Sequence, residues 1–298
     1  MNPPRFGRVV TAMVTPFDDA GSVDFNVARD LARHLVHSGS DALVVAGSTG
    51  EGSSLSDAEK LDLFACVAEA VTEPVIAGST FANTDQSIAL SAQVAATGAQ
   101  GILATTPAYA RPSQAGIAGH LGAVAESTAL PIMLYDIPSR TGRKIQAATT
   151  IALAEKYANI VALKDASADL ASAAHVKATL GDDLDLYSGD DALTLAFMAV
   201  GAVGIVSVAA HWAGPEFAAM VRFAAAGDGA KAQSINEVLA ASCVFESNET
   251  YPNPMPSKAM MRLMGLAVGE CRLPHARGDA ALDAIASEVL AQLRSTRG

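Results

Sequence analysis

One lysine stands out by its place in the sequence. Lys164 directly follows the apolar run at residues 160–163 and therefore stands at the end of a predicted strand. A lysine in that position ordinarily extends its ammonium group to water. At the mouth of a barrel, however, partial desolvation favours the neutral amine, which attacks a ketone and forms an imine. The protonated imine withdraws electrons, so that an adjacent methyl group can lose a proton and become a nucleophile.

Other polar side chains follow neighbouring apolar runs. Tyr135 ends one of them and is placed to carry protons. Ser48 and Thr49 lie in a glycine-flanked turn, where hydroxyls and backbone N–H groups can hold a carboxylate. Arg140 follows a Pro-Ser pair, and its guanidinium can bind a second carboxylate in a bidentate manner. Each residue alone also fits an ordinary structural role, but their joint placement at strand ends favours one shared site.

Eight apolar runs recur along the chain, at a spacing of roughly 20 to 35 residues that suits a strand followed by a crossover helix. They cover residues 9–14, 42–46, 75–77, 101–104, 131–135, 160–163, 184–187 and 204–208. Their apolarity is continuous, which indicates burial on both faces, as in a parallel sheet. The pattern predicts a (β/α)8 TIM barrel, an α/β fold whose chemistry lies at the carboxyl ends of the strands.

The expected organisation is a barrel over residues 1–225 and a helical region over residues 226–298 that packs on it. A doubly wound Rossmann sheet is the alternative, but the early glycines Gly47, Gly50 and Gly52 have the wrong spacing for its fingerprint.

Asp190 and Asp191 are interpreted as a pair stabilised at a helix N-terminus rather than as an acid and a base.

Composition narrows the classes of partner. The 298 residues carry a net charge of -11, which argues against nucleic acid. No apolar run is long enough to span a bilayer, and residues 1–8 lack an apolar signal core, so we expect a cytoplasmic protein without a membrane partner. The three cysteines are far apart and the histidines are scattered, so we expect neither a disulfide framework nor a metal site.

Six ordered segments resemble the family of class I aldolases that contains dihydrodipicolinate synthase and N-acetylneuraminate lyase, and the resemblance runs over nearly the whole chain. The segments are residues 47–51, 106–114, 135–142, 163–166, 188–191 and 253–258. The segments around Arg140 and at residues 253–258 favour the synthase branch. The resemblance implies that Lys164 forms the imine with pyruvate and that Tyr135 donates and accepts the protons. No dissociable cofactor is implied.

Further roles follow from the same resemblance. Ser48 and Tyr109 would complete a proton relay, with Tyr109 reaching in from a neighbouring subunit of a homotetramer built as a dimer of dimers. Thr49 and Val206 would contact pyruvate, and we place Gly189 among the substrate contacts too. Arg140 would hold the carboxylate of aspartate 4-semialdehyde. The implied product is 4-hydroxy-tetrahydrodipicolinate, in lysine and diaminopimelate biosynthesis.

Several positions depart from the usual pattern of the synthases. Ser48 replaces a more common threonine and resembles the lyase branch, which keeps a second hypothesis open: another pyruvate aldolase, acting on a hydroxy-2-oxo acid. A third hypothesis is a non-catalytic sensor of 2-oxo acids. Departures near the expected lysine-inhibitor pocket predict weak or absent feedback by lysine. The departing residues are Ser48, Asp57, Lys60, Gln86, Ala108 and Asp136.

Overall fold

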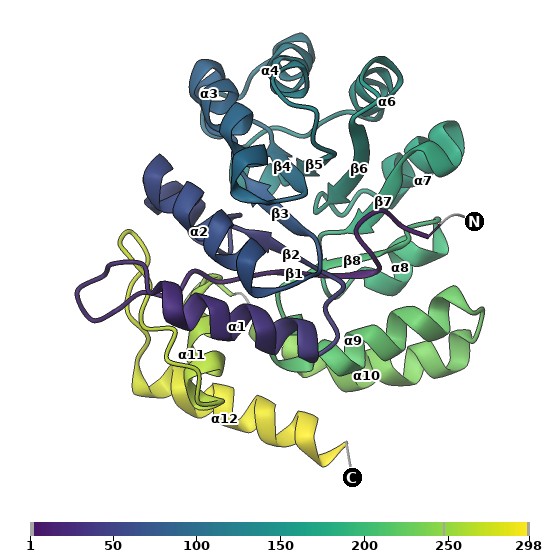
Figure 1. Cartoon of the computed structure of the whole chain (residues 1–298). Coiled ribbons are helices and arrows are strands. Elements are labelled where there is room, and N and C mark those ends of the chain that lie inside the picture. Colours follow the sequence, from purple (N-terminus) through teal and green to yellow (C-terminus); the bar gives the residue numbers. More distant parts are fainter. Residues whose placement is uncertain (1–2, 247, 297–298) are drawn as a thin grey trace.

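Eight short parallel strands close into a barrel in the computed structural model, which describes residues 3–246 and 248–296. Each strand pairs with its neighbour in chain order, and the last returns to the first (Figure 1). Each strand coincides with one of the predicted apolar runs to within two residues at either end, which confirms the (β/α)8 barrel. The strands are β1 (Val9–Ala12), β2 (Ala42–Val45), β3 (Val75–Gly78), β4 (Gly101–Thr105), β5 (Ile132–Asp136), β6 (Ile160–Asp165), β7 (Asp185–Ser188) and β8 (Gly204–Ser207).

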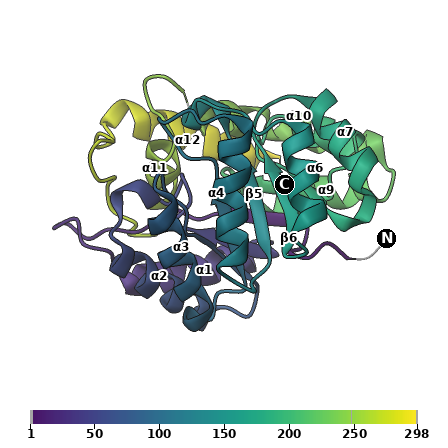
Figure 2. The ribbon, with the colours of Figure 1, turned by 90° about the horizontal axis from the view of Figure 1, so that it is seen from above.

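Helices alternate with the strands and form the outer layer, with α4 and α6 on the outside of β5 and β6 (Figure 2). None of the helices within the described residues combines the length and apolarity needed to cross a bilayer. The helices of this layer are α1 (Phe25–His37), α2 (Asp57–Ala70), α3 (Thr84–Val94), α4 (Gln114–Glu126), α5 (Pro138–Thr141), α6 (Ala147–Lys156), α7 (Leu170–Leu180), α8 (Thr194–Ala199) and α9 (Ala210–Ala225), with short 3-10 turns η1 (Gly52–Ser54), η2 (Ala95–Thr97) and η3 (Gly181–Asp183).

Side chains alternate between two cores because successive strand residues point to opposite faces. Leu163 faces outward into the core between sheet and helices, whereas Ala162 belongs to the cluster inside the barrel. Tyr135 and Val206 are members of this inner cluster as well. The alternation therefore decides which strand-end residues face the barrel interior.

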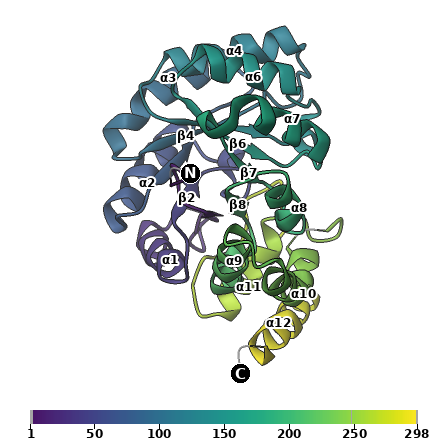
Figure 3. The same ribbon diagram turned by 90° about the vertical axis from the view of Figure 1, so that its right-hand side faces the viewer.

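Three further helices lie on the α9 side of the barrel, away from α3 and α4 (Figures 1 and 3). They are α10 (Gly229–Phe245), α11 (Met255–Leu263) and α12 (Ala280–Ser295). The Trp212 indole on α9 meets the Phe245 ring edge-on at 5.8 Å between centroids, and it donates to the Ser242 hydroxyl at 2.9 Å. The predicted division at residues 225 and 226 falls between α9 and α10, and as a domain boundary it stays a prediction.

Candidate active site

Lys164 and Tyr135 lie side by side inside the barrel, at the carboxyl ends of β6 and β5. They are register partners, and the Lys164 Nζ atom lies 4.2 Å from the centroid of the Tyr135 ring. Lys164 follows Ala162 by two residues, so it too faces inward, and only 4% of it is exposed. A largely dehydrated amine beside a phenol has the components that imine formation and proton transfer require.

Gly189 leaves the space that the lysine side chain occupies. A Cβ atom on Gly189 would lie 3.0 Å from Cγ of Lys164 and 2.9 Å from Cβ of Ala166. The Gly189 N–H donates to the carbonyl of Asp165 at 2.7 Å, which holds the end of β7 against the end of β6. Any larger residue here would press on the stem of Lys164 and displace its amine. The structure thus places Gly189 against the lysine itself.

The turn that carries Ser48 and Thr49 is held by close backbone contacts. A Cβ on Gly52 or on Gly78 would come within 2.1 or 2.4 Å of the Ala46 carbonyl oxygen, so only glycine fits at both positions. Ala46 itself takes a left-handed backbone, with φ of 53°. Thr49 is buried behind the turn, whereas Ser48 is half-buried and lines a cavity at the carboxyl end of the barrel.

Asn253 joins two of the predicted site residues. Its side-chain amide donates to the Thr49 hydroxyl at 2.8 Å, and its backbone carbonyl accepts a hydrogen bond from Arg140 at 3.1 Å. In the sequence, Asn253 belongs to the resembling segment at residues 253–258, and no role is predicted for it. Because Thr49 is 204 residues away, no local pattern could reveal the contact, and membership of that segment was the available signal.

Glu51 anchors the same turn to the C-terminal region. Its carboxylate forms an ion pair with Lys258 at 2.8 Å and accepts a hydrogen bond from the Arg272 N–H at 2.8 Å. Both side chains of the ion pair are fully buried. Burial lowers the pKa of Lys258, and the charge of Glu51 opposes that shift. Removing one partner of such a pair costs on the order of 3–5 kcal/mol.

Asp136 connects the loop that carries Arg140 to the segment after Lys164. Its carboxylate accepts from the Ile145 N–H at 3.0 Å, and its carbonyl accepts from the Ala166 N–H at 2.8 Å. Burial raises the pKa of Asp136 to about 7 against the opposing effect of the Ile145 hydrogen bond, and the charge of the nearby Asp165 raises it further. This carboxyl group therefore changes charge near neutral pH.

The cavity at the carboxyl end of the barrel measures about 410 Å³, and Ser48 and Arg140 both line it. Val206 lies in β8, inside the barrel, and is 1% exposed.

Tyr109 does not lie with these residues. It is 97% exposed, and its backbone is left-handed with φ of 68°. The structure thus groups Tyr135 and Gly189 around Lys164, and it links Ser48, Thr49 and Arg140 at the carboxyl end of the barrel, whereas the Tyr109 side chain is exposed. Within the described residues, no three His, Cys, Asp or Glu side chains gather as metal ligands would.

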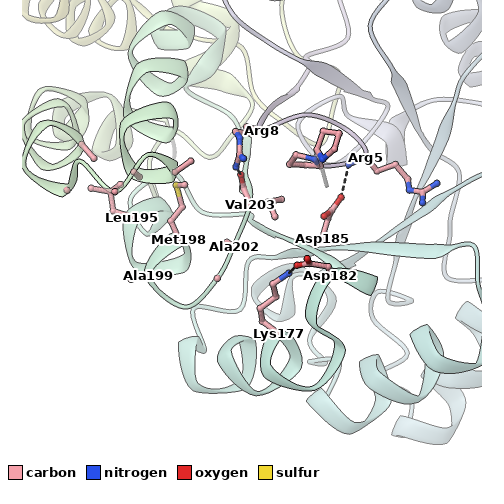
Figure 4. A pocket seen from close by; sticks show the side chains of 18 of the residues that line it. Arg5, Arg8, Lys177, Asp182, Asp185, Leu195, Met198, Ala199, Ala202 and Val203 are labelled. Carbon is pink, nitrogen blue, oxygen red and sulfur yellow. Dashed lines mark hydrogen bonds and ion pairs between the residues drawn. The ribbon is translucent and has the colours of Figure 1, made fainter. Parts of the chain in front are cut away.

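A larger pocket, about 670 Å³, lies at the opposite end of the barrel (Figure 4). Two of its cations already have partners: Arg8 donates to the Val203 carbonyl at 2.8 Å, and Lys177 lies 3.7 Å from Asp182. The Asp185 carboxylate accepts from the Arg5 N–H at 2.7 Å. None of the site residues predicted from the sequence lines this pocket. Its size therefore does not make it the candidate active site.

A buried lysine beside a tyrosine, inside a (β/α)8 barrel, is the arrangement expected of a class I aldolase. The chain belongs to the dihydrodipicolinate synthetase family, whose model matches residues 5–290. The 4-hydroxy-tetrahydrodipicolinate synthase of Moorella thermoacetica is 47% identical over 272 residues, which cover 91% of this chain and 92% of the relative. The enzyme of the same name from Bacillus subtilis is 43% identical over 272 residues, 91% of this chain and 93% of the relative.

Solved structures are similar in fold and in sequence. The dihydrodipicolinate synthase of Cyanidioschyzon merolae with lysine bound has a TM-score of 0.94 and 41% identity, covering 97% of this chain and 98% of that one. The dihydrodipicolinate synthase DapA-2 of Bacillus anthracis has a TM-score of 0.93 and 39% identity, with the same coverage. The TIM barrel and the C-terminal helices are thus those of this family.

Proposed function

We propose that the chain is a 4-hydroxy-tetrahydrodipicolinate synthase, a lyase that condenses pyruvate with L-aspartate 4-semialdehyde. The observation that carries the proposal is the burial of Lys164 beside Tyr135 at the carboxyl end of the barrel. Curated relatives that carry this name and are 42–47% identical over most of their length support it. The activity serves lysine and diaminopimelate biosynthesis.

In the proposed reaction, the neutral amine of Lys164 attacks the ketone carbon of pyruvate. The resulting carbinolamine loses water to give the imine, and Tyr135 supplies and removes protons. Loss of a methyl proton gives an enamine, which forms the new carbon–carbon bond with the aldehyde. The amino group of the semialdehyde then attacks the imine carbon, so that the ring closes and Lys164 is released. No dissociable cofactor takes part in these steps.

The remaining residues would bind and position the substrates. Thr49 and Val206 contact pyruvate, while Gly189 keeps Lys164 in place. Arg140, at the cavity, pairs with the carboxylate of the semialdehyde, and a guanidinium suits that planar group. Ser48 passes protons between Tyr135 and solvent. Asn253 supports the arrangement because it holds both Thr49 and Arg140.

We further propose a homotetramer in which Tyr109 completes the proton relay of a neighbouring copy. Nearly full exposure of a tyrosine on a left-handed backbone supports this, because such a ring gains most by burial against a partner. A cytoplasmic location also stays a prediction. Weak feedback by lysine is proposed because the Lys60 ammonium, only 1% exposed, lines the cavity and would repel a second amine.

The test combines turnover with trapping of the imine. The purified chain is given pyruvate and aspartate 4-semialdehyde, and the product is coupled to a dihydrodipicolinate reductase while NADPH loss is followed. In parallel, borohydride with pyruvate should fix an adduct that peptide mapping places on Lys164. Lys164→Ala should abolish both signals, and Lys156→Ala, at an exposed lysine of α6, should change neither.

Two outcomes would redirect the proposal. An adduct on Lys164 without turnover would support a sister aldolase with a different acceptor, the hypothesis that Ser48 favours. Absence of an adduct would support a non-catalytic sensor of 2-oxo acids.

A further inference from the structure

The segments that follow β7 and β8 are joined by one buried carboxylate. Asp191, in the loop after β7, is 2% exposed. Its carboxylate accepts hydrogen bonds from the Val208 N–H at 3.0 Å and from the Ala209 N–H at 2.7 Å, just beyond β8. Gly189 precedes Asp191 by two positions, and Val206 precedes Val208 by two. Asp191 therefore links the two segments that carry Gly189 and Val206, both predicted to lie at the substrate.

Glu246, at the C-terminal end of α10, brings a second carboxyl group to the same place. Helix α10 lies alongside α9, and the Glu246 side chain is at hydrogen-bond distance from that of Asp191 (Figures 1 and 3). Oδ1 of Asp191 and Oε2 of Glu246 are shielded from solvent, and neither has an N–H or O–H donor in the part of the chain that the structure describes. Two carboxyl groups that touch inside a protein do not both ionise, so the pair holds one proton.

The surroundings of the pair place this proton on Glu246. Two backbone N–H donors already make Asp191 the acceptor. Burial raises the pKa of Glu246 well above its usual range, and the charge of Asp191 raises it further. The other titratable groups that face the pair are Asp190 and Cys243, whose pKa values burial raises, and His211, whose pKa burial lowers to about 4. None of these three supplies a cation near neutral pH that would draw the proton away.

We propose that Glu246 is a positioning residue whose protonated carboxyl group donates a hydrogen bond to Asp191. The bond ties the end of α10 to the segments after β7 and β8, and so holds Gly189 and Val206 in place around pyruvate. This effect on pyruvate rests on the function proposed above, whereas the shared proton does not. A glutamine amide has nearly the same shape as the protonated carboxyl group and also donates, but it has no proton to lose near neutral pH.

The first test compares two replacements of Glu246 by the pyruvate concentration that half-saturates the borohydride-trapped adduct on Lys164. Glu246→Ala removes the donor, and this concentration should rise about tenfold, the low end of the loss of a hydrogen bond to a charged group. Glu246→Gln keeps the donor and should stay within about twofold of the unchanged protein. The matched control is Glu237→Gln, at an exposed residue of the same helix, which should change nothing.

Two results of this comparison would overturn the proposal. In one, Glu246→Ala takes up pyruvate as the unchanged protein does. In the other, Glu246→Gln loses as much as Glu246→Ala, which would show that the hydrogen bond donor is not what matters.

A pH series measures the shared proton without using activity. Because the folded chain binds this proton more tightly than the unfolded chain, the stability contribution of Glu246 is present below about pH 4 and is lost as pH rises through its raised pKa. The free energy of unfolding should therefore fall less steeply from pH 5 to pH 9 in Glu246→Gln than in the unchanged protein or in Glu237→Gln. An equal pH dependence in all three proteins would contradict the shared proton.

The same pH series extends to pyruvate. The half-saturating concentration should rise more steeply with pH in the unchanged protein than in Glu246→Gln, since Lys164 and the other titrating groups are present in both. Identical pH profiles would contradict the positioning role. Absence of the adduct in every protein would contradict the function proposed above, and the unfolding comparison would still decide whether Glu246 and Asp191 share a proton.

Discussion

The barrel has a hollow at each end, and the larger one, about 670 Å³, lies at the amino ends of the strands. There Arg8 and Lys177 already bind carbonyl or carboxylate oxygens of the chain itself (Figure 4). The smaller one, about 410 Å³, lies at the carboxyl ends and is lined by Lys60, a buried lysine that contacts the Phe81 ring but has no hydrogen bond or ion pair among the described residues. Volume alone therefore does not identify the candidate site, because the predicted residues Ser48 and Arg140 line the smaller hollow.

Tyrosines at the two ends should give the largest contrast. Tyr135→Phe should lower kcat by about 10²–10⁴-fold, because a positioned proton donor and acceptor is lost, while Lys164 can still be trapped as an adduct. Tyr187, also inside the barrel, donates instead to the Gly7 carbonyl at 2.8 Å near the amino end. Tyr187→Phe should cost about 1 kcal/mol of stability and leave kcat unchanged. Steady-state kinetics measure kcat, and thermal unfolding measures stability. Equal kcat values for the two variants would contradict the different roles of Tyr135 and Tyr187.

Arginines at the two ends should differ in substrate binding. Arg140→Ala should raise KM for the aldehyde by roughly 10- to 150-fold, the equivalent of a lost charge-assisted hydrogen bond, with little effect on KM for pyruvate. Arg8→Ala should leave both constants unchanged, because Arg8 binds the Val203 carbonyl. The kinetic constants for each substrate are measured separately. A similar loss for both substrates in Arg140→Ala would contradict its assigned role.

A smaller effect should appear as a pH dependence at the carboxyl end. Asp136 has its pKa raised to about 7 by burial, so its charged form, the better acceptor for the Ile145 N–H, prevails above pH 7. The rate of turnover at limiting aldehyde should therefore rise several-fold between pH 6 and pH 8, and Asp136→Asn should reduce that rise. Because the folded chain binds this proton more tightly than the unfolded chain, the stability contribution of Asp136 is present below about pH 4 and is lost as pH rises through 7. The free energy of unfolding, measured from pH 4 to pH 8, should depend less steeply on pH in Asp136→Asn than in the unchanged protein. An identical dependence in the two proteins would contradict this assignment.

The smallest effect is expected from the ion pair at the amino end. Lys177→Met removes a cation that lies 3.7 Å from Asp182, whose side chain is 66% exposed. Such a pair contributes about 0–1 kcal/mol to stability, so the free energy of unfolding should barely change. The turnover rate should not change at all. Turnover is measured with both substrates at saturation. A clear loss would show that the amino-end pocket takes part in the reaction.

The strands and the inward direction of Lys164 could be predicted because both depend on local pattern. Continuous apolar runs mark strands that are buried on both faces, and a period of two sets the face of each residue. The link between Asn253 and Thr49 could not be predicted, because the two residues are 204 positions apart and meet only after the barrel closes. The same holds for Glu51, whose partners lie in α11 and beyond it.

The acidic pair after β7, Asp190 and Asp191, shows that side-chain contacts can be hard to predict from the sequence even within a single loop. Asp190 accepts from the N–H groups of Ala192 and Leu193 just before α8, as predicted for a helix N-terminus. Asp191 also lies at a helix N-terminus, but at that of α9 rather than α8, because its carboxylate accepts from the N–H groups of Val208 and Ala209. Neighbouring residues point in different directions here, and the sequence alone does not say which helix start a buried carboxylate will reach.

The contact between Asn253 and the turn at Thr49 also bears on how the protein is made. A nascent chain that has emerged as far as residue 225 contains every strand, with Lys164 and Tyr135, but not the amide that holds Thr49 and Arg140. The amine proposed to form the imine is thus synthesised well before Asn253, which holds two of the proposed substrate-binding residues. A chain cut short at residue 225 would contain Lys164 but lack Asn253, so the last quarter of the sequence must be translated before this contact can form.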